Sequence, residues 1–294
     1  MALLCACEQG APPREAAPAD SAVVLRDDAG VEVRLAGPAR RIVSLVPSAT
    51  DLLAAIGAGD RLVARTDFDH GPGLDSLPSV GGGLDPSLEA LAALRPDVVI
   101  SWETRQGATL RDRLGALGIP VLGVRANDTT DVFRVIRTLG VLTGRPGPAD
   151  SLARSIRAEL AAVRASVAGR TPRSVLYVAW PNPPTVPGRE TFHHQLLELA
   201  GGRSVFDDVP GEWPQVSLEE VVRRQPEVVL VPAGEDSQLS AAALRRATGW
   251  RELNAFAAGR VVELPAVVVN RPGPRLGEAA RLIRDAIHPD LAGQ

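Results

Sequence analysis

The chain has 294 residues, 45% of them hydrophobic and 23% charged, and a formal net charge of −3. This composition is globular, and the length suits one large domain or two of ordinary size. The slightly negative charge gives no support to nucleic-acid binding, which needs a basic face. No apolar run in the sequence reaches the roughly 18 residues of a membrane span. Both cysteines lie near the N-terminus, so the body has neither a disulfide nor a cysteine metal site.

Residues 1–21 differ in character from the rest. The start is short and apolar, and Leu4-Cys5-Ala6-Cys7 resembles a lipoprotein cleavage box, in which a small residue precedes the cysteine that takes the lipid. The Ala- and Pro-rich tract over 8–20 is typical of a tether. We expect a signal-peptide remnant whose true start lies upstream, with Cys7 lipidated, followed by a tether. The alternative is a ragged terminus with two incidental cysteines.

Strand and helix patterns alternate through the first half. The expected elements are a hairpin over 23–35, a strand over 41–46, a helix over 47–57 capped by Ser48 or Thr50, a strand over 62–64, a helix from Ser87, a strand over 98–100, a helix over 109–117, a strand over 121–124 and a helix over 130–142. This alternation predicts a mostly parallel sheet.

One segment of the sequence occurs twice in similar form. Residues 87–100 read SLEALAALRPDVVI, and residues 217–230 read SLEEVVRRQPEVVL. Each copy predicts a short helix that ends before a proline, followed by a buried strand. The separation of the copies is far longer than the roughly 20–50 residues of a solenoid unit. The repeat therefore indicates two similar α/β lobes, which would face each other across a cleft.

A long helix is predicted between the two halves, over 146–168. Asp150 and Ser151 are its expected caps, apolar residues follow the helical period, and neither Pro nor Gly occurs between 149 and 167. Such a segment is a rigid connector rather than a flexible linker. We divide the body into an N-terminal lobe over 22–145, a connecting helix over 146–170 and a C-terminal lobe over 171–290.

The second half repeats the order of the first. Its expected elements are a strand over 174–178, a helix and glycine turn over 195–202, the second repeat helix, a strand over 228–231, a helix over 241–253, a strand over 261–264 and a helix over 275–287.

Tryptophans occupy the places where a ligand would bind. Ligands of open α/β sheets bind beyond the carboxyl ends of the strands. Trp102 and Trp180 each come two residues after a predicted strand, and Trp213 comes just before the second repeat helix. Trp is large, rigid and suited to covering a flat ligand. The alternative is that these side chains seal the edges of the lobes, and Trp250 is expected in the core.

Other residues after strand ends complete the predicted ligand side. Gly82 and Gly83 belong to a glycine run, which lets the backbone approach a ligand closely or forms a plain loop. Asn270 and Arg271 follow the last strand, and Arg271 would hold an anionic or amide group or lie free in solvent.

An enzyme is the alternative from another class. His193, His194 and Glu198 offer a metal-dependent hydrolase site, with His194 and Glu198 one helical turn apart. A zinc site needs three or four ligands, so we favour a surface helix start for this segment and expect neither a metal nor a cofactor.

The sequence resembles the periplasmic cobalamin-binding proteins, which belong to the helical-backbone class of ABC-transporter substrate-binding proteins. The resemblance extends over about residues 27–288 and rests on RIVSLVPSAT at 41–50, RPDVVISW at 95–102, LGIPV at 117–121, NPP at 182–184, WPQVSLE at 213–219 and GRV at 259–261. It implies an α/β fold of two Rossmann-like lobes with mostly parallel sheets, joined by a single long rigid helix, with the ligand in the cleft between the lobes.

The resemblance also implies partners and site residues. A corrinoid would bind in the cleft of a monomer held at the periplasmic or extracytoplasmic membrane surface, and Glu89 and Glu219 would dock on arginines of an ABC permease dimer. The ligand-side residues that it implies, together with those argued above, are Phe68, Gly82, Gly83, Trp102, Trp180, Trp213, Asn270 and Arg271. The family pattern has an aromatic residue at Gly83, another at Thr185 and an acid at Val267.

The same class includes receptors for haem and ferric siderophores. Haem usually takes an axial Tyr or His, but Tyr177 is expected inside a strand, which leaves His70 as the cleft candidate. Siderophore receptors favour several arginines in the cleft. Candidates here are Arg65, Arg105, Arg125, Arg271 and Arg275.

Overall fold

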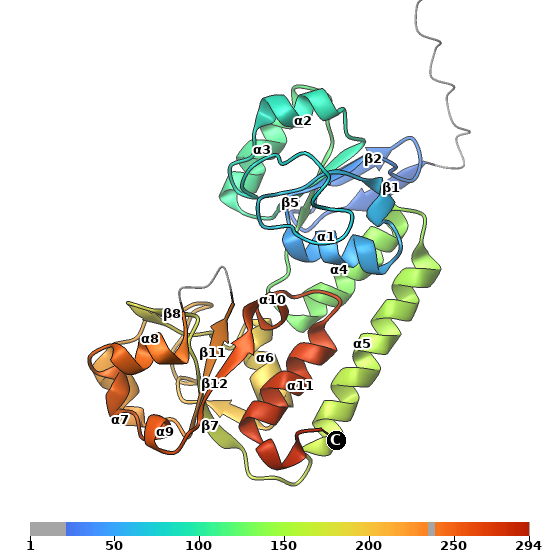
Figure 1. Ribbon diagram of the computed structural model, residues 1–294. Helices are drawn as coiled ribbons and strands as arrows, with labels where there is room; N and C mark the ends of the chain where they lie inside the picture. Colours follow the sequence, from blue (N-terminus) through green and yellow to red (C-terminus); the bar gives the residue numbers. More distant parts are fainter. Residues whose placement is uncertain (1–21, 235–238, 294) are drawn as a thin grey trace, which may run out of the picture.

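The computed structural model describes residues 22–234 and 239–293. The predicted signal remnant and tether over 1–21, including Cys7, lie outside the described residues. Two α/β lobes are joined by a long helix, α5 (Pro146–Ser166), which runs along one side of both (Figure 1).

The N-terminal lobe is built on a four-stranded parallel sheet in the order β4-β3-β5-β6. The strands of this sheet are β3 (Ile42–Ser44), β4 (Leu62–Ala64), β5 (Val98–Trp102) and β6 (Val121–Val124). The helices of the lobe are α1 (Pro47–Ala55), α2 (Leu88–Leu94), α3 (Arg105–Gly115) and α4 (Thr129–Leu142). An antiparallel hairpin of β1 (Val23–Arg26) and β2 (Glu32–Leu35) precedes these elements.

The C-terminal lobe repeats this topology. Its parallel sheet has the order β10-β7-β11-β12. In both lobes, the strands of the sheet therefore lie side by side in the order second, first, third, fourth along the chain. Its strands are β7 (Arg173–Tyr177), β10 (Gly202–Ser204), β11 (Val228–Ala233) and β12 (Val261–Pro265), its helices are α6 (Phe192–Leu199), α7 (Leu218–Arg224), α8 (Ala241–Arg246), α9 (Asn254–Ala257), α10 (Ala266–Val269) and α11 (Leu276–Ile287), and β8 (Trp180–Pro181) pairs with β9 (Pro184–Thr185). The predicted fold of two α/β lobes with parallel sheets is confirmed.

The sequence repeat folds twice into the same local structure. The hydroxyl oxygen of Ser87 accepts a hydrogen bond from Ala90 N at 3.2 Å, and that of Ser217 accepts one from Glu220 N at 3.1 Å. Both serines therefore cap their helices. Each helix ends on a left-handed residue, Arg95 with φ 45° and Gln225 with φ 42°, directly before its proline. The chain then enters β5 or β11.

Helix α5 contacts α4 of one lobe and α11 of the other. It buries Ala149, Ala153, Ile156, Leu160 and Val163, and one continuous hydrophobic core extends through both lobes and this face of α5. The caps expected at residues 150 and 151 were wrong, because the helix already begins at Pro146. The fixed φ of proline suits the first helical position.

Other boundaries also differ from the predictions. Helix α3 begins at Arg105, capped by Thr104. Neither Ser48 nor Thr50 caps α1, because that helix begins at Pro47 without a side-chain cap. The helix expected over 241–253 stops at residue 246 and is followed by a short turn at Trp250–Glu252. Gly249, with φ 85°, separates the two. Strand β10 and the short helices α9 and α10 were not predicted.

Candidate functional site

A pocket of about 360 Å³ lies between the lobes, at the carboxyl ends of strands from both sheets. Its lining residues are Trp102, Ala126, Asn127, Ala179, Thr191, Phe192, His193, Glu212, Trp213, Asn270 and Pro272. A larger hollow of about 500 Å³ is lined by residues of β12 and α11 and has no aromatic side chain. We take the interlobe pocket as the candidate site because ligands of open α/β sheets bind at strand carboxyl ends.

Aromatic rings form much of the wall. Trp102 is the last residue of β5, and Trp213, 44% exposed, lies in the loop before α7. The rings of His193 and Trp213 meet edge-on, with centroids 5.2 Å apart and planes at 74°. Phe192 stacks near His193 at 3.9 Å. Of the three tryptophans expected on the ligand side, Trp102 and Trp213 line the pocket and Trp180 does not.

The polar lining residues His193 and Asn270, which we call the floor of the pocket, share hydrogen bonds with buried Tyr177 and carry no charge. The Tyr177 hydroxyl donates to Asn270 Oδ1 at 2.5 Å, and His193 Nε2 lies 3.3 Å from the same oxygen. Burial lowers the pKa of the His193 imidazole to about 4, although the hydrogen bond to Asn270 acts in the opposite direction. His193 is therefore neutral near pH 7, and with Oδ1 as its acceptor it carries its proton on Nε2.

Hydrogen bonds join the lobes beside the pocket. Phe192 N donates to the carbonyl oxygen of Asn127 at 2.6 Å, and Asn127 Nδ2 donates to Glu212 Oε1. Thr129 donates to Gln195 Oε1 through its amide at 2.9 Å and its hydroxyl at 2.7 Å. The loop between β6 and α4 is therefore both a pocket wall and an attachment point for the opposite lobe.

Arg271 spans the lobes instead of lining the pocket. Its Nη1 lies 3.2 Å from Asp51 Oδ2, and its Nη2 donates to the Phe68 carbonyl oxygen at 2.7 Å. Burial raises the pKa of the Asp51 carboxyl, while the charge of Arg271 and its hydrogen bond act to lower it. Asp51 belongs to α1, so this contact ties the C-terminal lobe to the N-terminal one. The Phe68 side chain is exposed.

The remaining predicted ligand residues lie near the pocket but do not line it. An added Cβ at Gly83 would lie 2.4 Å from the Leu45 carbonyl oxygen and 3.9 Å from Trp102 Nε1, whereas one at Gly82 would meet nothing within 4 Å. Trp180 is 60% exposed and donates from Nε1 to the Asn182 carbonyl oxygen at 3.0 Å. The glycine run therefore brings the backbone close to the neighbouring strand end.

The two adjacent histidines were expected at a surface helix start; the helix start is confirmed, but the surface location was wrong. His193 and His194 are both buried. His193 faces the pocket, whereas His194 Nε2 lies 3.5 Å from Glu198 Oε1 and 3.5 Å from Asp207 Oδ1. The two imidazoles thus contact different partners. In the part of the chain that the structure describes, no group of three or more His, Cys, Asp or Glu side chains is arranged to hold a metal ion.

Sequence reasoning missed several lining residues, among them Asn127, Phe192, His193 and Glu212. Thr191 was the available signal for two of them. Its hydroxyl caps α6 by accepting from His194 N at 3.3 Å. A Thr two positions before the histidines marks a helix start, and the helix start is what turns Phe192 and His193 inward.

Glu89 and Glu219 occupy equivalent positions, in the first turns of α2 and α7. Both side chains belong to exposed residues. Across residues 22–234 and 239–293, no helix has the length and apolar character needed to cross a membrane.

Curated relatives match most of the chain. An uncharacterized ABC transporter substrate-binding lipoprotein of Bacillus subtilis, YvrC, is 28% identical over 275 residues, which cover 91% of this chain and 86% of the relative. A vitamin B12-binding protein of Salmonella paratyphi A is 29% identical over 255 residues, covering 85% and 90% of the two chains.

Solved structures share the fold over nearly their whole length. The periplasmic vitamin B12 binding protein BtuF of Vibrio cholerae superposes with a TM-score of 0.73 at 27% identity, covering 87% of this chain and 99% of that one. The periplasmic heme-binding protein RhuT of Roseiflexus gives 0.71 at 26%, covering 85% and 99%. An ABC-type Fe3+-hydroxamate transport protein of Saccharomonospora viridis gives 0.72 at 27%, covering 90% and 99%.

The family described as "Periplasmic binding protein" matches residues 42–268, which include both sheets and the helix between them. The predicted resemblance to the cobalamin-binding members of this class is confirmed by the relatives and the shared fold. The chain belongs to the periplasmic binding protein family and is a substrate-binding protein of an ABC transporter.

Proposed function

We propose that this protein binds a corrinoid of the cobalamin type in the interlobe pocket and delivers it to an ABC permease. The observation that carries the proposal is the chemistry of the pocket: aromatic walls above a neutral polar floor. A corrinoid is large and flat, and its edge bears amides that exchange hydrogen bonds without needing a counter-charge. Apolar burial would supply affinity and the few polar groups would set orientation.

The charge of the lining favours this ligand over haem or a ferric siderophore. Of the described lining residues, Glu212 alone carries a charge at neutral pH, and it is negative. Haem propionates and anionic siderophores require cationic partners. Three candidate arginines instead pair with carboxylates: Arg125 with Asp131, Arg271 with Asp51 and Arg275 with Glu278.

The two axial candidates named from the sequence, Tyr177 and His70, are poorly placed for haem, although His193 does line the pocket. Tyr177 is 2% exposed and its hydroxyl is held by Asn270. His70 lies in an exposed loop with Nδ1 3.7 Å from Asp75 Oδ1, outside the pocket lining. The similar RhuT and Fe3+-hydroxamate structures keep haem and ferric hydroxamate as the second candidates.

The decisive experiment is isothermal titration of the chain from Ala22 onward with cyanocobalamin. We expect a Kd in the nanomolar to low-micromolar range, and Trp102→Ala or Trp213→Ala should weaken binding by about tenfold or more. Trp180→Ala is the matched comparison, because its exposed ring lies outside the lining, and it should cost less. No heat at micromolar protein would exclude cobalamin. Haem, followed by its Soret absorbance, and ferric hydroxamate would then be titrated.

We further propose that Glu89 and Glu219 dock on a symmetric permease. Two equivalent exposed acids, held apart by α5, match a partner that presents two equivalent basic sites. The acids also stabilise their own helix starts by about 0.3–1 kcal/mol, so stability alone does not test the proposal. Glu89→Arg and Glu219→Arg should abolish binding to the permease while leaving the ligand Kd unchanged. Asp112→Arg, at an exposed position of α3, should leave both unchanged.

The proposed location is the periplasm or the outer face of the membrane, with a monomer tethered through Cys7. The Bacillus subtilis relative is named a lipoprotein, and Cys7 follows the cleavage-box pattern. Metabolic labelling with a lipid-alkyne should mark the wild type and fail to mark Cys7→Ser, whereas Cys5→Ser should remain labelled.

A further inference from the structure

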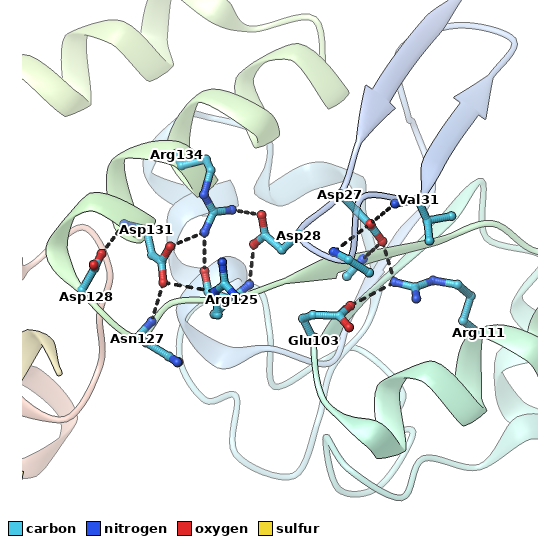
Figure 2. A network of polar contacts seen from close by, with 12 residues as sticks. Asp27, Asp28, Val31, Glu103, Arg111, Arg125, Asn127, Asp128, Asp131 and Arg134 are labelled. Atoms are coloured by element: carbon cyan, nitrogen blue, oxygen red, sulfur yellow. Dashed lines mark hydrogen bonds and ion pairs between the residues drawn. The ribbon is translucent and has the colours of Figure 1, made fainter. Parts of the chain in front are cut away.

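The turn of the N-terminal hairpin is anchored to the carboxyl end of β6 by two carboxylates, Asp27 and Asp28 (Figure 2). The Asp27 side chain is fully buried; it accepts hydrogen bonds from the amides of Ala29 and Val31 inside the turn, at 3.0 and 2.8 Å. It also accepts from Gly123 N at 3.1 Å and pairs with Arg111 at 2.5 Å. Asp27 therefore fixes the turn and places the next residue.

That next residue, Asp28, holds the loop after β6. Asp28 Oδ2 accepts from Arg125 N at 2.6 Å, and Oδ1 pairs with Arg134 of α4. Asp131 completes the network, since it also pairs with Arg134 and accepts from Asn127 N at 3.0 Å. Two backbone amides of the short segment 125–127 are thus bound by carboxylates from different elements, as Figure 2 shows.

The other side of this segment faces the pocket and the opposite lobe. Ala126 and Asn127 line the pocket. The Asn127 carbonyl oxygen accepts from Phe192 N across the lobe boundary, and its side chain reaches Glu212. The segment therefore connects the hairpin turn on one side with the start of α6 on the other.

We propose that Asp28 is a positioning residue for the ligand pocket: through the Arg125 amide it holds the Ala126–Asn127 wall in the geometry that binds both the ligand and α6. The part of this inference that concerns the ligand rests on the proposed function, whereas the part that concerns the contact between the wall and α6 does not. If the hairpin served only to cover the sheet, apolar side chains in its turn would suffice. Burying the carboxylates of Asp27 and Asp28 instead carries a desolvation cost, which their hydrogen bonds to the loop offset. Preorganised binding surfaces lose less entropy when the ligand binds.

The test compares Asp28→Ala with Glu32→Ala in the full chain. Both remove one carboxylate from the same hairpin, but Glu32 pairs with exposed Arg34 of the hairpin itself and not with the loop after β6, among the described residues. Amide hydrogen exchange without ligand should accelerate about tenfold at residues 125–127 and at Phe192 in Asp28→Ala alone. The Kd for cyanocobalamin should rise about tenfold in the same variant. Asp28→Asn, which keeps an acceptor for Arg125 N–H, should restore most of both.

Wild-type exchange at Phe192 together with a wild-type Kd in Asp28→Ala would overturn the proposal. So would equal acceleration in every strand, since that means general destabilisation, or the same effects in Glu32→Ala. If the wild type itself does not bind cyanocobalamin, the corrinoid proposal fails separately. The exchange at Phe192 then decides alone whether Asp28 positions the wall.

Discussion

At the scale of single residues, Gly83 has a role in packing beside the pocket. A Cβ there would come within 2.4 Å of the Leu45 carbonyl oxygen, which is backbone and cannot swing away. We predict that Gly83→Ala destabilises the protein by about 1–3 kcal/mol, the usual range for overpacking. Gly82→Ala, with open space around its added methyl, should leave the free energy of unfolding unchanged. Urea unfolding of both variants would check this, and equal midpoints would contradict it.

His193 should make stability depend on pH. Its folded pKa of about 4 lies below the ordinary 6.5, so between these values the unfolded chain binds a proton that the folded chain does not. The stabilisation is complete above pH 6.5 and is lost as pH falls toward 4, by up to about 3 kcal/mol.

We therefore predict that His193→Gln is less sensitive to acid than the wild type. The free energy of unfolding, measured in urea at pH 7.5 and at pH 4.5, should fall further for the wild type than for the variant. Comparing the two removes the contribution of other titrating groups, His288 among them, whose pKa burial also lowers. Parallel curves for the two proteins would contradict the assignment.

At the scale of elements, the two repeat helices end in the same backbone conformation, but the side chains of their end residues make different contacts. Arg95 and Gln225 both take a left-handed conformation, which costs a non-glycine residue about 1–2 kcal/mol. The Gln225 side chain offsets this cost with two hydrogen bonds: it accepts one from Asn254 N at 2.8 Å and donates one to the Glu252 carbonyl oxygen at 3.3 Å. The Arg95 side chain is exposed.

Replacing each residue with glycine should separate these two cases. Arg95→Gly relieves the backbone and should stabilise the protein by about 1 kcal/mol. Gln225→Gly relieves the same strain but loses two hydrogen bonds of about 1 kcal/mol each, so it should give no gain. Thermal unfolding of the pair is the measurement. A higher melting temperature for Gln225→Gly than for Arg95→Gly would refute the explanation.

At the scale of the whole molecule, glycines let α5 approach both lobes closely. An added Cβ at Gly140 of α4 would lie 2.6 Å from the Ala149 Cβ, and one at Gly277 of α11 would lie 2.5 Å from the Glu159 Cβ. The absence of a side chain at these two glycines therefore allows α5 to pack closely against α4 and α11. The hydrophobic core shared by the two lobes continues along the buried face of α5.

We predict that Gly277→Ala costs about 1–3 kcal/mol, because the packed helices would have to separate. Gly147→Ala is the matched control in α5 itself. Its methyl would meet nothing within 4 Å, and the better helix propensity of alanine should stabilise the helix by up to about 1 kcal/mol. Chemical unfolding distinguishes the signs, and destabilisation by both variants would argue against a specific contact at Gly277.

Most of the helices and strands, and their order along the chain, could be predicted from local sequence patterns, whereas β10, α9 and α10 could not. The repeated segments, the connector and Trp102 at a strand end follow from patterns within a few residues, where side-chain spacing decides the structure. The tertiary structure alone decided the pocket. Arg271 of the C-terminal lobe meets Asp51 of the N-terminal lobe from 220 positions away, and the amide of Phe192, next to His193, binds the Asn127 carbonyl oxygen of the opposite lobe. Such contacts depend on how two separately patterned lobes meet, and local spacing carries no information about that geometry.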